Sequence, residues 1–204
     1  MTEKPNAPSC ERNQEVILKV LKELVKPRAK NLFEIGSGTG QHAVFMAPNF
    51  SQLQWHTSDL LENHPGINLW LTDSDSKNIV KPIVYQAGKS AFPKIDIDVV
   101  FTTNTLHIMS WGNVQDLIEQ LGKHLKPGAQ IIIYGPFNYN GKFTSQSNAE
   151  FDLWLKQRAS YSGIRDFEKI KQLMNAASIK LIDDIQMPAN NRILHFIKQN
   201  SFVK

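Results

Sequence analysis

The sequence has one cysteine, Cys10, among its 204 residues. A single thiol cannot form an intramolecular disulfide, and it cannot supply the several thiolates of a structural zinc site. The 6 histidines are dispersed, and neither a His-Glu-x-x-His pattern nor a cluster of carboxylates accompanies them. The sequence therefore gives no support for a disulfide framework or for metal-assisted catalysis.

Long apolar runs are also missing. The longest, over 131–137, is far shorter than the roughly 20 residues that a membrane-spanning helix requires. Residues 1–10 contain an acid and two prolines, and they lack the apolar run of a secretory signal. We therefore expect a cytoplasmic protein with no membrane span.

Clustered positive charge is absent as well. The chain has 23 basic and 19 acidic residues, and no two lysines or arginines are adjacent. A net charge of +4 without a basic patch does not point to a nucleic-acid partner. With 41% hydrophobic residues, the composition is that of a globular protein. We expect one domain over 1–204, with an amino-terminal arm and helix over 1–27.

Helical and strand-like patterns alternate along the whole chain, which predicts an α/β fold. The expected strands cover 31–35, 53–58, 83–86, 98–102, 131–134, 179–187 and 192–198. The expected helices cover 16–25, 43–47, 65–71, 114–125, 148–157 and 167–177. Because only residues 188–191 separate the last two strands, these two must be antiparallel. We therefore expect a mostly parallel sheet with one antiparallel strand.

A glycine-rich turn follows the first expected strand, with Gly36, Gly38 and Gly40 in the spacing G-x-G-x-G and Glu34 just before them. Glycine lets a ligand approach the backbone, and the amides at the start of a helix are free to donate. A pyrophosphate-binding turn has the spacing G-x-G-x-x-G instead. A carboxylate at Glu34 would repel a phosphate and attract an amino group, so the pattern favours S-adenosylmethionine.

A second acid, Asp59, follows the second expected strand. A carboxylate at the end of this strand can accept hydrogen bonds from both ribose hydroxyls of a nucleoside. The alternative is an ordinary glycine turn and a solvated acid. The order of strand, glycine turn, helix, strand and acid favours the cofactor site.

The motif from Glu34 to Gly40 resembles the first motif of class I S-adenosylmethionine-dependent methyltransferases, and Leu-Lys-Pro-Gly at 125–128 resembles a later one. More closely, the chain resembles a family of small methyltransferase-like proteins catalogued as a domain of unknown function. The resemblance lies in residues 12–13, 37–43, 58–59, 104–108, 111, 134–137, 147–149, 151–152, 163–166 and 187–191. It implies a Rossmann-like, seven-stranded methyltransferase fold with helices on both faces of the sheet.

The resemblance also implies a set of cofactor-binding residues, with the amino group near Glu34 and the ribose near Asp59. The expected cofactor-binding residues are Glu34, Gly36, Ser37, Gly38, Gly40, Asp59, Gln86 and Asn104. Gln86 departs from the family, because similar proteins usually carry an acid at the end of the third strand, beside the adenine amino group. A glutamine carbonyl can still accept that hydrogen bond.

His107 follows the fourth expected strand, at the edge where an open α/β sheet presents groups to its ligand. An imidazole with a pKa near 6.5 suits proton removal from a hydroxyl, amine or thiol. The alternative is a structural histidine, since transfer from a sulfonium needs little beyond alignment. The strand lacks the Asn-Pro-Pro-aromatic run of enzymes that methylate nucleic-acid bases.

The acceptor side is less defined. Residues 135–165, above all the polar stretch 135–147, are expected to form a lid over the acceptor site. Residue types and the resemblance together nominate acceptor-binding residues, although such residues are more often helix caps or surface groups. They are Arg12, Asn13, Trp111, Asn138, Tyr139, Arg165 and Asn191.

The sequence thus predicts an S-adenosylmethionine-dependent methyltransferase acting on an oxygen, nitrogen or sulfur atom of a small molecule. One alternative is a non-catalytic module that binds the cofactor and acts through a protein partner. A nicotinamide-dependent oxidoreductase is a further alternative, disfavoured by the glycine spacing and by Glu34. The acceptor and the oligomeric state are not specified by the sequence.

Overall fold

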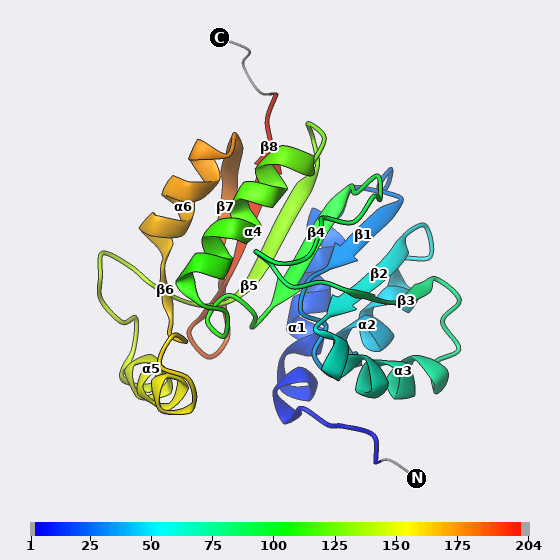
Figure 1. Cartoon of the computed structure of the whole chain (residues 1–204), viewed down its shortest axis with the longest axis horizontal. Coiled ribbons are helices and arrows are strands. Elements are labelled where there is room, and N and C mark those ends of the chain that lie inside the picture. The colour runs from blue at the N-terminus through cyan, green and yellow to red at the C-terminus, as the bar shows by residue number, and fades with distance from the viewer. Residues whose placement is uncertain (1–2, 201–204) are drawn as a thin grey trace. The chain divides into compact units, whose positions relative to one another are not determined.

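A computed structural model describes residues 3–200 (Figure 1). The chain divides after Thr102 into two compact units. We call residues 3–102 the first unit and residues 103–200 the second unit. Each unit has its own strands, helices and buried side chains.

The first unit is a parallel sheet in the order β3-β2-β1-β4. Its elements are α1 (Pro8–Leu24), β1 (Asn31–Glu34), α2 (Gln41–Met46), η1 (Ala47–Asn49), β2 (Gln54–Asp59), η2 (Leu61–Asn63), α3 (His64–Thr72), β3 (Ile79–Val84) and β4 (Val99–Thr103). Helix α2 packs against both α1 and α3. Parallel strands joined by helices place the carboxyl ends of β1 and β2 at the same edge of the sheet.

The core of the first unit is aromatic. Trp55, Phe33 and Phe101 are fully buried on neighbouring strands, and the rings of Trp55 and Phe101 meet edge to face with centroids 5.7 Å apart. Helix α1 buries Ile17 and Leu21, four residues apart on one helical face. Burial of side chains this large supplies about 1.5–3 kcal/mol each and anchors the strand ends that follow.

The second unit contains the antiparallel strand. Its elements are α4 (Trp111–His124), β5 (Gln130–Asn138), α5 (Gln146–Arg158), β6 (Arg165–Asp166), α6 (Phe167–Ala176), β7 (Ile179–Met187) and β8 (Asn191–Lys198). Strand β8 is antiparallel to both β5 and β7, so the prediction from the short link 188–191 is confirmed. Helices α4 and α6 pack closely at Gly122, where an added Cβ would lie 2.8 Å from that of Ala177.

Three predicted boundaries are wrong by four residues or more. The first helix begins at Pro8 rather than at residue 16. The third strand covers Ile79–Val84 rather than 83–86, so Gln86 lies beyond its end. The expected lid 135–147 does not begin at Gly135, because β5 continues through Gly135 and Pro136 to Asn138 and is buried throughout. The reason is that β8 pairs with this end of β5, with Pro136 opposite Asn191, and β6 pairs with it as well. Tertiary pairing therefore overrides the turn-forming residue types.

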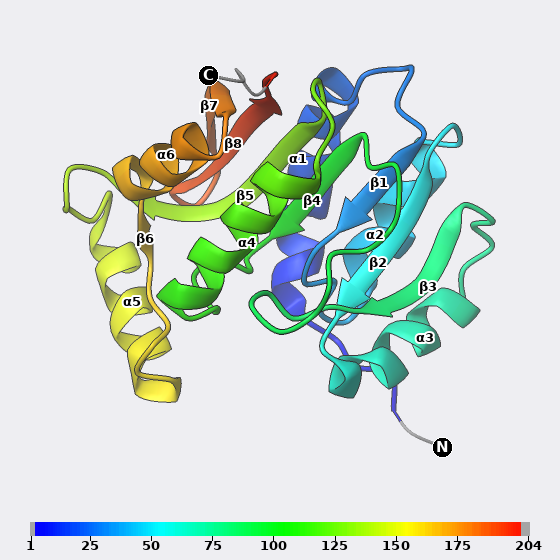
Figure 2. The ribbon, with the colours of Figure 1, turned by 45° about the horizontal axis from the view of Figure 1, so that its top comes forward.

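Helix α5 lies apart from α4 and α6 in both views of the second unit (Figures 1 and 2). Leu153 and Trp154 on this helix are exposed, whereas Leu155 and Asp152 are buried. None of the helices within residues 3–200 is long and apolar enough to cross a membrane.

Candidate functional site

The glycine turn joins β1 to α2 in the first unit. Gly38 has φ +60°, and a Cβ added to it would meet no atom within 4 Å. Gly40 has φ +89° and caps α2, and its added Cβ would lie 3.3 Å from Ile67 on α3. Gly40 thus serves the packing of α3, whereas Gly38 leaves open space beside the turn.

Glu34 is a fully buried acid at the end of β1, 1% exposed. Its Oε2 accepts hydrogen bonds from Trp55 Nε1 at 2.9 Å and from the Ser37 hydroxyl at 3.0 Å. Its Oε1 is buried and has no hydrogen-bond partner within the described chain. Burial raises the pKa of Glu34 to about 7, although the bonds from Trp55 and Ser37 oppose the shift. The site therefore contains a carboxyl group with one unsatisfied oxygen.

Asp59 ends β2 and binds the turn directly. Its Oδ2 accepts from the Gly38 amide at 2.6 Å, and its Oδ1 accepts from the Leu60 amide and from Asn63 Nδ2, both at 2.7 Å. A carboxylate offers about four acceptor positions, so one remains. Asp59 is thus held in place by three donors before any ligand is considered.

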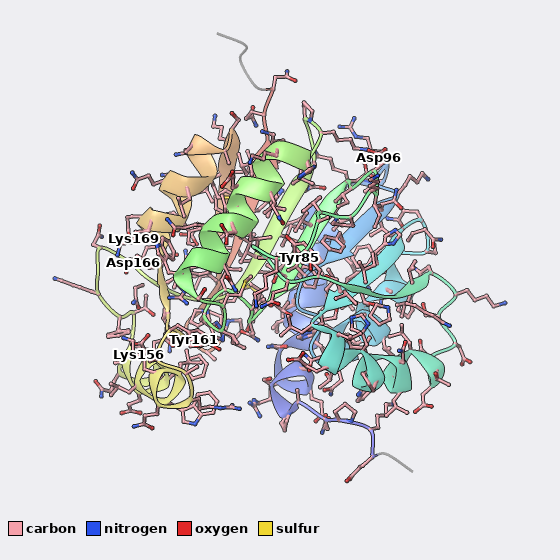
Figure 3. All side chains as sticks on the ribbon, in the orientation of Figure 1. Tyr85, Asp96, Lys156, Tyr161, Asp166 and Lys169 are labelled. Atoms are coloured by element: carbon pink, nitrogen blue, oxygen red, sulfur yellow. The ribbon has the colours of Figure 1, made fainter. Side chains whose placement is uncertain are left out.

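Six of the eight expected cofactor residues lie together in the first unit, on the turn and the ends of β1 and β2. Gln86 follows Tyr85, whose amide donates to the Asp59 carbonyl oxygen at 3.0 Å (Figure 3). Gln86 is therefore beside the ends of the strands, in a turn closed by Ser90. Asn104 belongs to the second unit, where it has φ +54° and its amide donates to Tyr134.

Gln41, a buried residue to which the sequence assigned no role, connects the turn to the amino-terminal segment. Its Oε1 accepts from the Thr39 hydroxyl at 2.8 Å and from the Ala7 amide at 2.7 Å. Its Nε2 donates to Asn6 Oδ1 at 2.7 Å. The position of Gln41 directly after Gly40 is a signal in the sequence that could have drawn attention to it. No sequence pattern marks its partners Asn6 and Ala7.

Asn13 on α1 is one of the expected acceptor-site residues, and its side chain pairs with a histidine of α2. Asn13 Oδ1 lies 2.8 Å from His42 Nε2, and Cys10 Sγ lies 3.8 Å from His42 Nδ1. Burial lowers the pKa of His42 to about 4 and raises that of Cys10 to about 11, so both groups are neutral at pH 7. Arg12 is exposed on α1, the helix that also carries Asn13.

His107 is buried in the second unit, with 5% of its surface exposed. Its ring meets that of Phe151 edge to face, with centroids 5.3 Å apart. A Cβ added to Gly135 would lie 3.7 Å from its Nδ1 and 3.9 Å from Asn104 Oδ1. Burial, with a smaller effect from Arg165, lowers the pKa of His107 to about 4.

Arg165 organises the backbone around His107. Its guanidinium donates to the carbonyl oxygens of Leu106, Met109 and Tyr161. Asp152 of α5 accepts from the Ile164 amide at 2.7 Å and pairs with Lys156 at 2.6 Å. Figure 3 labels Lys156 and Tyr161 on this part of the second unit. These bonds join the segment after β4 to the segment after α5.

The other expected acceptor residues have different surroundings. The Tyr139 hydroxyl donates to Asp184, which also binds Arg192, and Asn191 Nδ2 donates to Pro188 and Ala189 within the β7–β8 turn. Asn138 is buried, and its Oδ1 has no partner among residues 3–200. Trp111 is the first residue of α4. Within the same residues, no group of three His, Cys, Asp or Glu could hold a metal ion.

Solved structures with the same fold include methyltransferases. They include the human N-acetylserotonin methyltransferase in complex with S-adenosylmethionine, at 15% identity and TM-score 0.77, with 94% of this chain and 53% of that chain covered. An O-methyltransferase family protein from Burkholderia thailandensis has 16% identity and TM-score 0.77, with 96% and 58% covered. An O-methyltransferase family 2 protein from Planctomyces limnophilus, in complex with apigenin, has 13% identity and TM-score 0.78, with 94% and 60% covered.

This chain spans less than two thirds of the length of these proteins, and identities this low establish the fold alone. The fold is the Rossmann-like class I methyltransferase fold that the sequence predicts, with a mostly parallel sheet and one antiparallel strand. A family described as "Protein of unknown function (DUF938)" matches residues 4–198. The chain belongs to this family, as its glycine turn and its other matching segments predicted.

Proposed function

We propose that this protein binds S-adenosylmethionine in its first unit and transfers the methyl group to an oxygen, nitrogen or sulfur atom of a small molecule. The observation that carries the proposal is the glycine turn, where open space at Gly38 adjoins two buried acids, Glu34 and Asp59. The cofactor supplies a methyl group already activated on a sulfonium sulfur. The residues of the chain bind and orient the reactants.

The residues present fit this cofactor. Glu34 Oε1 is a buried acceptor in need of a donor, and a cationic amino group is a donor that a carboxylate prefers. Asp59 keeps one acceptor position for a ribose hydroxyl. A carboxylate at Glu34, directly before the turn, would repel a pyrophosphate, which argues against a dinucleotide.

We propose His107 as the general base. The lowered pKa keeps its imidazole neutral at pH 7. A neutral imidazole can accept the proton that a hydroxyl, amine or thiol loses as it gains a methyl group. Arg165 holds the backbone next to this histidine, and Phe151 packs against its ring.

One observation favours a non-catalytic module that binds the cofactor and acts through a protein partner. Tyr139, Arg165 and Asn191, all expected to contact an acceptor, direct their polar side chains to groups of the protein itself. Incubation with S-adenosylmethionine carrying an isotope-labelled methyl group in cell extract separates the two functions. Label in a small molecule supports the enzyme, and cofactor binding without label transfer supports the module.

The binding site itself is tested by calorimetry with S-adenosylmethionine and S-adenosylhomocysteine. Gly38→Val should raise the Kd for both by about 100-fold, because a branched side chain would fill the open space. Gly128→Val is the matched control, since Gly128 also has positive φ and open space but lies in the second unit. It should lower Tm similarly and leave the Kd unchanged.

Equal losses of affinity in the two glycine variants would reject the turn as the binding site. Tight binding of reduced nicotinamide cofactor by the wild-type protein, without binding of S-adenosylmethionine, would replace the proposal by the oxidoreductase alternative.

A further inference from the structure

The amino-terminal segment, which we define as residues 4–13, is seated on α3. Lys4 Nζ lies 2.8 Å from Asp73 Oδ2 and 3.8 Å from the centroid of the Trp70 ring. The Trp70 indole donates to the Pro5 carbonyl oxygen at 2.7 Å. A Cβ added to Gly66 would lie 2.7 Å from Pro5 Cγ, so this glycine permits the close approach. The segment therefore has a defined place in the first unit.

Gln41 joins this segment to the glycine turn through one side-chain amide. The amide accepts from Thr39 and Ala7 and donates to Asn6, with all three distances between 2.7 and 2.8 Å. Only 3% of Gln41 is exposed. Its donor and acceptor are both engaged, so this buried amide has no polar group left unsatisfied at Oε1 or Nε2.

Thr39 is the residue through which this connection can affect a ligand. It lies between Gly38 and Gly40, which both have positive φ and offer no side chain to restrain the turn. Its hydroxyl, bound to Gln41, is a second side-chain anchor of the turn, beside the bond from the Gly38 amide to Asp59. A turn held in one conformation before binding loses less entropy when a ligand arrives.

We infer that Gln41 is a positioning residue of the cofactor site, and that through it the amino-terminal segment contributes to cofactor affinity. Gln41 acts on Thr39 and so on the Gly38 turn, not on the reacting atoms. The inference rests on the proposed function. Because coupling is reciprocal, a bound cofactor must stabilise the docked segment by the same factor by which the segment raises cofactor affinity.

The central test is calorimetry with S-adenosylhomocysteine on Gln41→Leu, which keeps the size of the side chain and removes its hydrogen bonds. The loss of one to two net hydrogen bonds corresponds to a rise in Kd of about 5- to 50-fold. Gln41→Glu should stay within about fivefold of wild type, because its carboxylate still accepts from Thr39 and Ala7. The matched control is Gln54→Leu at the exposed start of β2, which should leave the Kd within about twofold.

A second variant keeps the inference testable if Gln41→Leu does not fold. The side chain of Asn6 is exposed, and Asn6→Ala removes one hydrogen bond to Gln41. The Kd should therefore rise by about two- to fivefold at unchanged Tm. The double variant should bind no more weakly than Gln41→Leu alone, since both changes break one connection. Hydrogen exchange at residues 4–13 should slow on cofactor binding in wild type and not in Asn6→Ala/Gln41→Leu.

The outcomes separate this inference from the proposed function. No binding of S-adenosylhomocysteine or S-adenosylmethionine by wild type would reject the proposed function. Tight wild-type binding that is unchanged in Gln41→Leu, or in Asn6→Ala if Gln41→Leu does not fold, would overturn the positioning role alone. Fully additive effects of Asn6→Ala and Gln41→Leu would overturn it too.

Discussion

Among the described residues of the first unit, the backbone angle φ is positive at four glycines, Gly36, Gly38, Gly40 and Gly88. In the second unit φ is also positive at five residues that carry side chains: Asn104, Asn140, Ser178, Ala189 and Asn190. Left-handed backbone costs an ordinary L-residue about 1–2 kcal/mol. Glycine avoids that cost and leaves the space beside the chain empty, which a ligand can use.

The two units also differ in how far their polar groups are already bound within the protein. In the first unit the turn is ordered by Asp59 and Glu34 and still has an open side at Gly38 and an unpaired oxygen at Glu34. In the second unit, Arg165 and Tyr139 are already bound to other protein groups. The first unit thus resembles a preformed binding site, and in the second unit His107 is the group best suited to chemistry.

His107→Asn tests that assignment with the largest expected effect. Asparagine keeps hydrogen-bonding capacity and approximate size but cannot take up a proton. If His107 is the base, turnover should fall by about 10²–10⁴-fold while the Kd for the cofactor is unchanged. Because burial lowers the pKa to about 4, the acidic limb of the wild-type rate profile should lie near pH 4 and should vanish in the variant. The measurement is kcat against pH with an identified acceptor.

The opposite outcome would assign His107 a structural role. In that case His107→Asn would change Tm and retain turnover within a few-fold of wild type, with the same pH profile. The control is His56→Asn, since His56 lies on β2 in the first unit and pairs with Asn31.

Asp59→Ala should weaken cofactor binding by about 10- to 150-fold, because charge-assisted hydrogen bonds of about 1.5–3 kcal/mol are lost. Since Asp59 also holds the Gly38 amide, the variant alone cannot assign the lost energy to the ribose. Calorimetry with adenosine and with its 2′,3′-dideoxy analogue resolves this. Wild type should prefer adenosine, and Asp59→Ala should bind both compounds equally. A preference that survives in Asp59→Ala would remove the ribose assignment.

Glu34 should make cofactor binding dependent on pH. A cationic amino group favours the ionised carboxylate, so affinity should rise by about tenfold between pH 6 and pH 8 as Glu34, with its pKa of about 7, loses its proton. Glu34→Gln should bind more weakly and show a flat profile. Calorimetry in two buffers of different ionisation enthalpy measures the released proton. An equally steep profile in Glu34→Gln would assign the effect to another group.

The same group predicts a stability change of defined sign. The folded pKa is raised from 4.5 to about 7, so the contribution of Glu34 to stability is full below pH 4.5 and is lost as the pH rises through 7. Without cofactor, Glu34→Gln should therefore gain in Tm relative to wild type as the pH rises from 5 to 8. A constant difference in Tm across this range would contradict the shifted pKa.

The smallest expected effect concerns the β7–β8 turn. Ala189 and Asn190 both adopt φ near +57°, a conformation that favours glycine or asparagine. Ala189→Gly should raise stability by about 0.5–1 kcal/mol, measured by urea unfolding, and should leave cofactor binding unchanged. Gly128→Ala should lower stability, since Gly128 has φ +87° and alanine would be strained there. If Ala189→Gly lowered stability, the alanine side chain would contribute more to stability than the backbone strain costs.

Local periodicity predicted the elements where a strand or helix is buried in a regular pattern. Strand β4 is buried at every position and was predicted to within one residue at each end. Strand β3 was predicted only in part, because it lies at the end of the strand order, includes Pro82 and shows no regular burial. Strand β6 was not predicted at all, since two residues carry no periodicity and exist as a strand only through pairing with β5.

The site shows the same division. The positions of the glycine turn and of its two acids at the ends of β1 and β2 could be predicted from spacing, because each depends on residues close in sequence. The bond from Trp55 to Glu34 and that from Gln41 to Asn6 join residues 21 and 35 positions apart. No local pattern marks such pairs. The burial of His107, which lowers its pKa, likewise depends on the position of Phe151 on a distant helix.

The docking of Lys4, Pro5 and Asn6 against the first unit also matters for protein engineering. An affinity tag or reporter fused to the amino terminus would be tethered beside the contacts that hold the glycine turn. A fusion partner that pulled this segment off α3 would break the Lys4–Asp73 ion pair and the bond from the Ala7 amide to Gln41.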